Sequence, residues 1–308
     1  MALAAALLFG ASAPLAKLLL NGTSPQLLAG LLYLGSGVGL GLLWVRRRGL
    51  AEGARETQLA RRDLPWLIAA IGFGGVLGPL LLMIGLTRTP ASGASLLLNL
   101  EGVFTALLAW FVFREHFDRR IALGMLAIVA GGVVLSWEGR LSWGGMIGPL
   151  AVVGACFSWA IDNNLTQKVS AGDPVQITML KGLTAGAVNT AIALSLGASW
   201  PATLRVLAAL VLGFLSYGVS LVFFVLALRR LGTARTGAYF STAPFVGALL
   251  SLAIFRERPT TFIIVAAALM AVGVWLHFTE RHEHKHRHET LEHDHAHVHD
   301  EHHQHVHA

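Results

Sequence analysis

Apolar stretches long enough to cross a lipid bilayer follow one another along most of this chain, up to residue 278. A helix needs about 20 predominantly apolar residues to span a hydrocarbon layer of about 30 Å. Hydrophobic residues make up 55% of the chain and charged residues only 13%, whereas soluble domains carry about 25% charged residues. So little charge cannot cover a globular core with a wetted surface, and the sequence predicts a polytopic membrane protein.

Proline positions help to divide the chain into ten predicted membrane-spanning helices. Prolines fall at most of the predicted helix starts, where a missing N–H group costs little. Three further prolines, Pro14, Pro79 and Pro244, lie inside spans and are expected to kink them. The predicted spans are 1–20, 25–45, 64–87, 91–113, 119–137, 145–168, 174–197, 203–229, 233–255 and 260–278.

Lys and Arg residues gather in the connections that would lie on the same side as both chain termini, most densely in residues 46–63. Because cytosolic connections carry an excess of Lys and Arg, we expect a bacterial-type inner-membrane protein with both termini in the cytoplasm. The isoelectric point near 10.1 arises from these short clusters rather than from one basic face, which argues against a nucleic-acid partner. The expected partners are membrane lipid and a small-molecule or ion substrate.

The chain contains an internal repeat, in which residues 88–135 align with residues 230–277. Ala-Leu-Leu at 106–108 recurs at 248–250, and Phe-Arg-Glu at 113–115 recurs at 255–257. Because each half holds an odd number of spans, the second half must cross the membrane in the opposite direction. Inverted repeats are typical of transporters, whose mirrored halves can exchange shapes around a site at mid-depth. A purely structural duplication would leave the same sequence signal.

The predicted fold is therefore an all-α membrane protein of ten transmembrane helices, arranged as two inverted five-helix repeats. We expect the first repeat at 1–138, the second at 139–278, and a disordered His-rich cytosolic tail at 279–308.

The two repeated stretches, each an apolar helix ending in Phe-Arg-Glu and followed by a helix that contains glycine, resemble the EamA repeat of the drug/metabolite transporter superfamily. The resemblance covers residues 1–278, and the tail belongs to no motif of that family. It implies a central cavity lined by helices 1, 3, 4, 6, 8 and 9, with helices 5 and 10 as supports. Family members export amino acids, metabolites or toxic compounds, so the resemblance implies export without fixing the substrate.

Glu101 is predicted to lie near mid-depth in the fourth span, beside Asn99 and Gly102. Charged groups at this depth are costly and are functional candidates by default. The counterpart of Glu101 in the second repeat is Ala243, so the two halves differ where a site is expected. Burial favours the protonated carboxyl, which suits proton coupling or cation binding. The alternative is a protonated Glu101 that bonds to a neighbouring helix and only supports packing.

Asp162 and Lys181 are predicted to lie at matching depth on consecutive helices. Each lies about 10 Å from the turn between those helices, at a rise of about 1.5 Å per residue. An ion pair would avoid two isolated buried charges, and it could serve as a structural clasp or as a gate or substrate contact. Together, the candidate residues for a substrate or coupling ion are Glu101, Asn99, Asp162, Asn163, Lys181, Tyr217 and Tyr239.

The tail holds most of the chain's 14 histidines, interleaved with carboxylates. Alternating histidines in an extended chain can wrap imidazoles around Zn²⁺, Ni²⁺, Co²⁺ or Cu²⁺. We therefore expect the tail to bind a divalent transition metal, as cargo or as a signal, and we expect no required cofactor. The predicted metal ligands are His282, His284, His286, His288, His293, His295, His297, His299, His302, His303, His305 and His307.

The residue pattern favours transport over catalysis. Intramembrane hydrolysis needs paired carboxylates, a Ser–His pair or a His-rich metal site within the spans. Outside the tail the histidines are His116 and His277, in or near connections, and Asp162 has no acidic partner at its predicted depth. We expect no enzymatic activity.

The preferred function is secondary export of a small metabolite or toxic solute. The alternative is export of divalent Ni, Co or Zn. A gated channel fits the same pattern.

Overall fold

The computed structural model describes residues 1–50, 59, 61–113, 119–136, 143–169, 172–231 and 239–278. Within these ranges every regular element is a helix. The His-rich tail, and with it every predicted metal ligand, lies outside the described residues.

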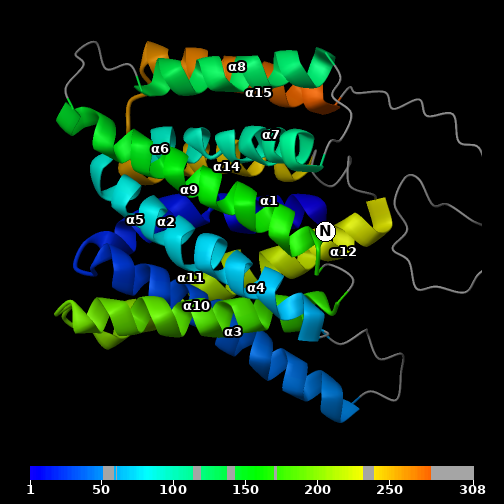
Figure 1. The fold of residues 1–308 in the computed structure, drawn as a ribbon. Coiled ribbons are helices and arrows are strands. Elements are labelled where there is room, and N and C mark those ends of the chain that lie inside the picture. The colour runs from blue at the N-terminus through cyan, green and yellow to red at the C-terminus, as the bar shows by residue number, and fades with distance from the viewer. Residues whose placement is uncertain are drawn as a thin grey trace, which may run out of the picture.

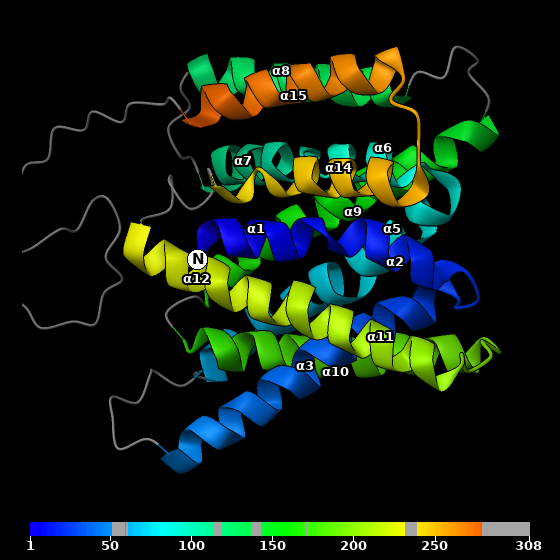
Figure 2. The ribbon, with the colours of Figure 1, turned by 180° about the vertical axis from the view of Figure 1, so that it is seen from behind.

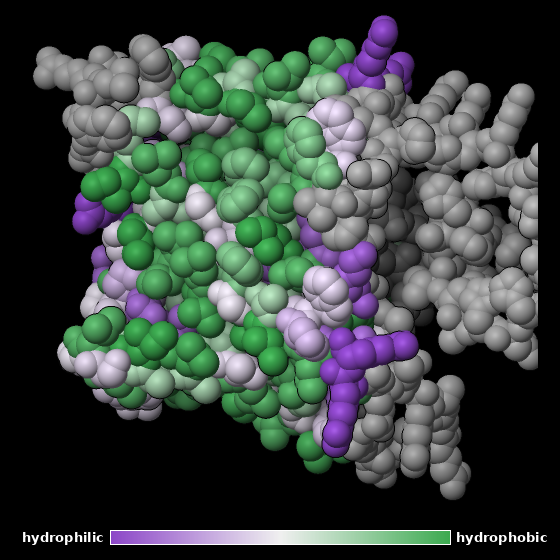
Figure 3. Space-filling model, viewed as in Figure 1, coloured by the Kyte–Doolittle hydropathy of each residue, from purple (hydrophilic) through white to green (hydrophobic). Residues whose placement is uncertain are grey.

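The described helices account for the ten predicted spans. Eight helical segments are long and apolar enough to cross a membrane, and two shorter apolar helices complete the set. Figure 3 shows an apolar belt around the visible face, with hydrophilic residues gathered at the two ends of the bundle. The elements are α1 (Ala2–Gly10), α2 (Ser12–Leu20), α3 (Pro25–Leu50), η1 (Arg61–Asp63), α4 (Leu64–Ala70), η2 (Ile71–Leu77), α5 (Gly78–Arg88), α6 (Ala91–Leu97), α7 (Leu100–Phe113), α8 (Arg119–Ser136), α9 (Trp143–Gln167), α10 (Pro174–Ser195), α11 (Thr203–Gly213), η3 (Phe214–Val219), α12 (Ser220–Leu231), α14 (Ala243–Phe255) and α15 (Thr261–Phe278).

Two span predictions need correction. Helix α3 continues to Leu50 instead of ending at residue 45, because arginine is a good helix former and nothing in the Arg-rich segment stops the helix. The fourth span, predicted as one helix over 91–113, is divided into α6 and α7 by a turn at Leu98 and Asn99.

The helices lie in layers, and three pairs of equivalent helices from the two repeats are neighbours (Figures 1 and 2). The fifth helices of the two repeats, α8 and α15, form one outer layer. The second helices, α3 and α10, pack together on the opposite side. The fourth and ninth spans, with α6 against α14, form the next layer inward, and α1, α2 and α9 run through the middle. The described helices confirm the predicted all-α membrane fold, and this side-by-side pairing is the arrangement expected of two inverted repeats.

The three prolines predicted to kink their spans lie where the structure interrupts its helices, whereas Pro149 lies inside the continuous helix α9. Pro14 follows the division of the first span at Ala11, and Pro79 is the second residue of α5, which follows the π-helical segment η2. Pro244 follows a turn at residues 241–242. Each proline lacks an N–H group and clashes with the carbonyl four residues earlier, which leaves that carbonyl without its helical partner.

Side chains from neighbouring helices bond the carbonyls of η2. The Gly75 carbonyl, four residues before the proline of α5, accepts a hydrogen bond from Asn189 Nδ2 at 2.9 Å. The adjacent Gly74 carbonyl accepts from the Tyr33 hydroxyl at 2.7 Å and from Trp159 Nε1 at 2.9 Å. Because lipid offers no donors, backbone groups at membrane depth must find partners within the protein. The irregular segment thus ties α3, α9 and α10 to the middle of the bundle.

Glycines set the distance between α3 and α10, so we predict that enlarging one of them destabilises the fold. A Cβ atom on Gly37 would lie 2.4 Å from the backbone nitrogen of Leu183, whereas one on Gly41 would lie 3.6 Å from the flexible Met179 side chain. Gly37→Ala should lower the free energy of unfolding by about 1–3 kcal/mol, as overpacking does. The matched control, Gly41→Ala, should be neutral or mildly stabilising. Denaturation of both variants in detergent tests this, and equal stabilities would contradict the close approach of the two backbones.

Candidate functional site

Interruptions of the helices occur at corresponding places in the two repeats. The fourth span is divided at Leu98 and Asn99, and the ninth has its turn at residues 241–242. The third and eighth spans contain the π-helical segments η2 and η3 at matching positions. Discontinuous helices near mid-depth build substrate and ion sites in transporters that have inverted repeats. The region around these interruptions is therefore the candidate site.

Glu101 lies in the first turn of α7, directly after the division of the fourth span. Its Oε1 accepts a hydrogen bond from Asn163 Nδ2 of α9 at 2.8 Å, and the same amide lies 3.4 Å from Thr105 Oγ1. Glu101 is half-buried, Asn163 is exposed, and a Cβ on Gly102 would meet no atom within 4 Å. Among the described residues, the ion pairs found do not include Glu101. The structure thus joins two predicted site residues, and no cation of the described ranges pairs with the carboxyl.

Asp162 and Lys181 form the predicted ion pair. Lys181 Nζ lies 2.6 Å from Oδ1 and 2.7 Å from Oδ2 of Asp162, and the two side chains are 9% and 10% exposed, respectively. The Thr166 hydroxyl donates to Asp162 Oδ1 at 2.8 Å and accepts from Lys181 Nζ at 3.1 Å. A Cβ on Gly74 would lie 1.9 Å from Asp162 Oδ2, so the pair packs directly against η2. Its charges are mutually satisfied, which fits a clasp between α9 and α10.

An aromatic cluster occupies the middle of the bundle around Phe9. The Phe9 ring lies 5.3 Å from Phe240, 5.9 Å from Tyr217 and 6.4 Å from Trp159, measured between ring centroids. Tyr33 extends the cluster, with its centroid 5.4 Å from that of Tyr217. These rings come from five different spans, so the cluster joins the two repeats at their centre. Sequence reasoning named only Tyr217.

Two other predicted site residues lie outside these groups. The Asn99 amide donates to the Leu96 carbonyl at 3.0 Å and lies 3.8 Å from Met270 Sδ of α15. It therefore closes the turn between α6 and α7 and faces the tenth span. Tyr239 is 43% exposed, and its carbonyl accepts from the Thr242 hydroxyl at 2.6 Å.

Metal-ligating side chains do not gather in the described part of the chain. No group of three or more His, Cys, Asp or Glu residues there is arranged to hold a metal ion. The predicted metal ligands all belong to residues 282–307, outside the described ranges.

The family of the chain follows from comparison with known proteins. Residues 1–137 and 146–279 match the EamA-like transporter family, and the chain belongs to that family. An uncharacterized transporter of Methanothermobacter thermautotrophicus is 30% identical over 287 residues, which cover 88% of this chain and 83% of the relative. The uncharacterized transporter YyaM of Bacillus subtilis is 25% identical, over 72% of this chain and 75% of YyaM. The chain is thus a multi-pass membrane protein of a transporter family.

A shorter relative and a solved structure add to this assignment. The probable 4-amino-4-deoxy-L-arabinose-phosphoundecaprenol flippase subunit ArnE of Pseudomonas fluorescens is 46% identical over 84 residues, which cover 27% of this chain and 72% of ArnE. A crystal structure with 19% sequence identity superposes with a TM-score of 0.65, over 89% of this chain and 94% of that chain. This structural likeness confirms the fold.

The geometry of the ion pair predicts the outcome of a double-mutant cycle. Asp162→Asn and Lys181→Met should each lower stability by about 3–5 kcal/mol, because each leaves one buried charge without its partner. The double variant should be much closer to wild type, since no charge remains unpaired. Thr166→Val keeps both charges and should cost only about 1 kcal/mol. Denaturation in detergent provides the measurement, and additive losses in the double variant would show that the two charges do not interact.

Proposed function

We propose that this chain exports a small metabolite or toxic solute by alternating access, with Glu101 carrying the coupling proton or cation. The observation that supports this most is the position of Glu101. Its carboxyl lies at the start of a half-helix and accepts one hydrogen bond from Asn163 at 2.8 Å, and no described cation neutralises it. A carboxyl held in this way can gain and lose a proton, or exchange it for a cationic ligand, without breaking a structural ion pair.

Asp162 is the less suitable coupling group. It is bound by Lys181 on both oxygens and by Thr166 on one. Protonation of Asp162 would leave a buried lysine without its counter-ion, which is costly. Of these two acidic side chains, Asp162 therefore has the structural role, and Glu101 is the one that can exchange a proton.

The paired interruptions support alternating access. The third and eighth spans are both π-helical where they pass the middle, and the fourth and ninth spans both contain a turn. Matching weak points in two inverted halves allow each half to adopt the shape of the other, which exposes a central site to the two sides in turn. We place both termini in the cytoplasm, as the distribution of Lys and Arg indicates.

We predict that Glu101→Gln leaves the protein folded but removes coupling. The amide keeps the volume and can still bond to Asn163, but it carries no titratable proton. Flux of labelled amino acids across reconstituted vesicles, with and without a pH gradient, gives the readout. The variant should lose the dependence of flux on the gradient, while Asp63→Asn, which removes a carboxyl at one end of the bundle, should retain it. Unchanged flux with an unchanged pH profile would reduce Glu101 to a packing role.

The alternative function is export of a divalent transition metal, favoured by the histidines of residues 282–307. A tail attached to the cytosolic mouth would hold captured ions near the path at a high effective concentration, even if each site were weak. Imidazole binds these metals only when it is neutral, so occupancy should fall as the pH drops through about 6.5.

Deletion of residues 280–308 distinguishes cargo capture from sensing. If metal is the cargo, the deletion should lower metal transport at limiting concentration and leave the saturated rate nearly unchanged. If the tail senses metal for another substrate, the deletion should abolish the metal dependence of that flux, with no metal flux in either protein. A truncated protein with unchanged metal binding, metal tolerance and transport would contradict both roles.

A further inference from the structure

Glu257 joins the second repeat to the fourth span at one end of the bundle. It belongs to the connection between α14 and α15, at the end opposite the N-terminus (Figure 2). Its Oε1 accepts from the backbone N–H of Ala91 at 3.1 Å, and its Oε2 accepts from the backbone N–H of Ser92 at 3.3 Å and from the Ser92 hydroxyl. The first N–H groups of a helix have no partner within it, so this carboxylate caps α6 from the other half of the molecule.

Lys17 of α2 makes a second connection at the same place. Its Nζ donates to the carbonyl of Thr89, which precedes α6, and lies 5.9 Å from the ring centroid of Phe255. Phe255 ends α14, two residues before Glu257. The first span, the start of α6 and the end of α14 are therefore held together by one acidic and one basic side chain.

The backbone around Glu257 adopts a conformation that does not arise by default. Arg256 has φ of 50° and ψ of 35°, which is the left-handed region. Among the described residues, no other non-glycine residue has a positive φ. Left-handed backbone is unfavourable for a residue with a Cβ. Here it ends α14 and turns the chain so that the next residue reaches the start of α6.

Helix α6 is a short, separate segment of the fourth span. Its sequence, Ala-Ser-Gly-Ala-Ser-Leu-Leu, begins with five small residues. All of its residues are buried, and the Ser95 hydroxyl has no hydrogen-bond partner. The turn at Leu98 and Asn99 separates α6 from α7.

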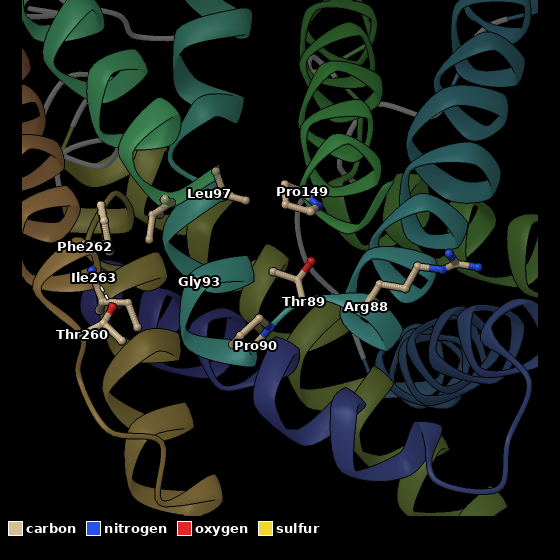
Figure 4. A pocket seen from close by; sticks show the side chains of 10 residues that line it. Arg88, Thr89, Pro90, Gly93, Leu97, Pro149, Thr260, Phe262 and Ile263 are labelled. Carbon is tan, nitrogen blue, oxygen red and sulfur yellow. Dashed lines mark hydrogen bonds between the residues drawn. The ribbon is translucent and has the colours of Figure 1, made fainter. Parts of the chain in front are cut away.

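An adjoining cavity provides space beside α6 (Figure 4). It has a volume of about 420 Å³ and is bounded by Gly93 and Leu97 of α6, by Pro149 of α9, and by Phe262 and Ile263 of α15. Figure 4 shows Gly93 and Leu97 on one wall of the cavity and Pro149 across from them.

We propose that Glu257 and Lys17 form a latch that holds α6 in place and closes the transport path at this end of the bundle. Release of the latch lets α6 move toward the cavity, with its hinge at Leu98 and Asn99. This inference rests on the proposed alternating access, because a path open at both ends at once would need no latch. It assigns a role to one of the two Phe-Arg-Glu motifs that the sequence repeats.

The single cysteine of the chain reports the position of α6 without any substrate. Cys156 is fully buried on α9, and its Sγ contacts the carbonyl of Leu97, the last residue of α6, at 3.5 Å. Displacement of α6 would remove this cover from the thiol. The experiment measures the rate at which N-ethylmaleimide modifies Cys156 in the full-length protein reconstituted in vesicles.

Glu257→Gln and, separately, Lys17→Met should increase the rate of Cys156 modification on the order of tenfold, because removal of the charge weakens charge-assisted hydrogen bonds by about that factor. The control Arg258→Gln changes an exposed charge in the same connection and should leave the rate unchanged. Equal rates in wild type and both latch variants would overturn the proposal.

A second reporter separates opening of the latch from general loosening of the fold. Ala266 is fully buried on α15, and Ala266→Cys in a Cys156→Ala background places a thiol in the packed pair of α8 and α15. Its modification rate should not respond to Glu257→Gln. Parallel increases at both cysteines would mean that the capping carboxylate only stabilises the bundle, and would also overturn the proposal. Neither result bears on the role of Glu101, so the latch can fail while the proposed export stands.

Discussion

A membrane interior contains no water to solvate charges or backbone groups, so each of them must find its partner within the protein. Several polar contacts between the described helices meet this requirement. The Asn189 amide and the Tyr33 hydroxyl bond the carbonyls of η2, and Lys181 neutralises Asp162. The prolines and charges that would otherwise destabilise the bundle are thereby converted into points where neighbouring helices are joined. The fold depends on these polar contacts between helices, because lipid provides no hydrophobic driving force for apolar helices to associate.

Glu101 departs from this pattern. It accepts a hydrogen bond from an uncharged amide, and no described cation balances it. The aromatic cluster around Phe9 and the interrupted spans lie in the same central region of the bundle. The fold does not need a cation beside Glu101, and the neighbouring helices are interrupted. Glu101 is therefore well suited to a reversible step such as proton exchange. The proposed Glu257 latch is a counterpart at one end of the bundle, where charged side chains join the two repeats.

The sequence predicted the features that depend on spacing and period. Apolar length defined the spans, and equal distance from a turn placed Asp162 opposite Lys181, because helical rise is constant. The interior prolines marked three interruptions. The division of the fourth span was missed because Leu98 and Asn99 carry no local signal, and it becomes visible only when α6 packs against α14. The Phe9 cluster was missed for a related reason: its rings come from five spans, and only the folded bundle brings them together. The contact of Glu257 with Ser92 joins residues far apart in the chain and has no periodicity to reveal it.

The central claim is that Glu101 gains and loses a proton in the folded protein, whereas Asp162 serves as the fixed partner of Lys181. Infrared spectroscopy measures this directly, since the carbonyl stretch of a protonated carboxyl is distinct from the bands of carboxylates. A pH titration of the reconstituted protein should show a protonated-acid band that disappears in Glu101→Gln and persists in the Asp162→Asn, Lys181→Met double variant. A titrating band that survives Glu101→Gln and is lost when Asp162 is replaced would contradict the account.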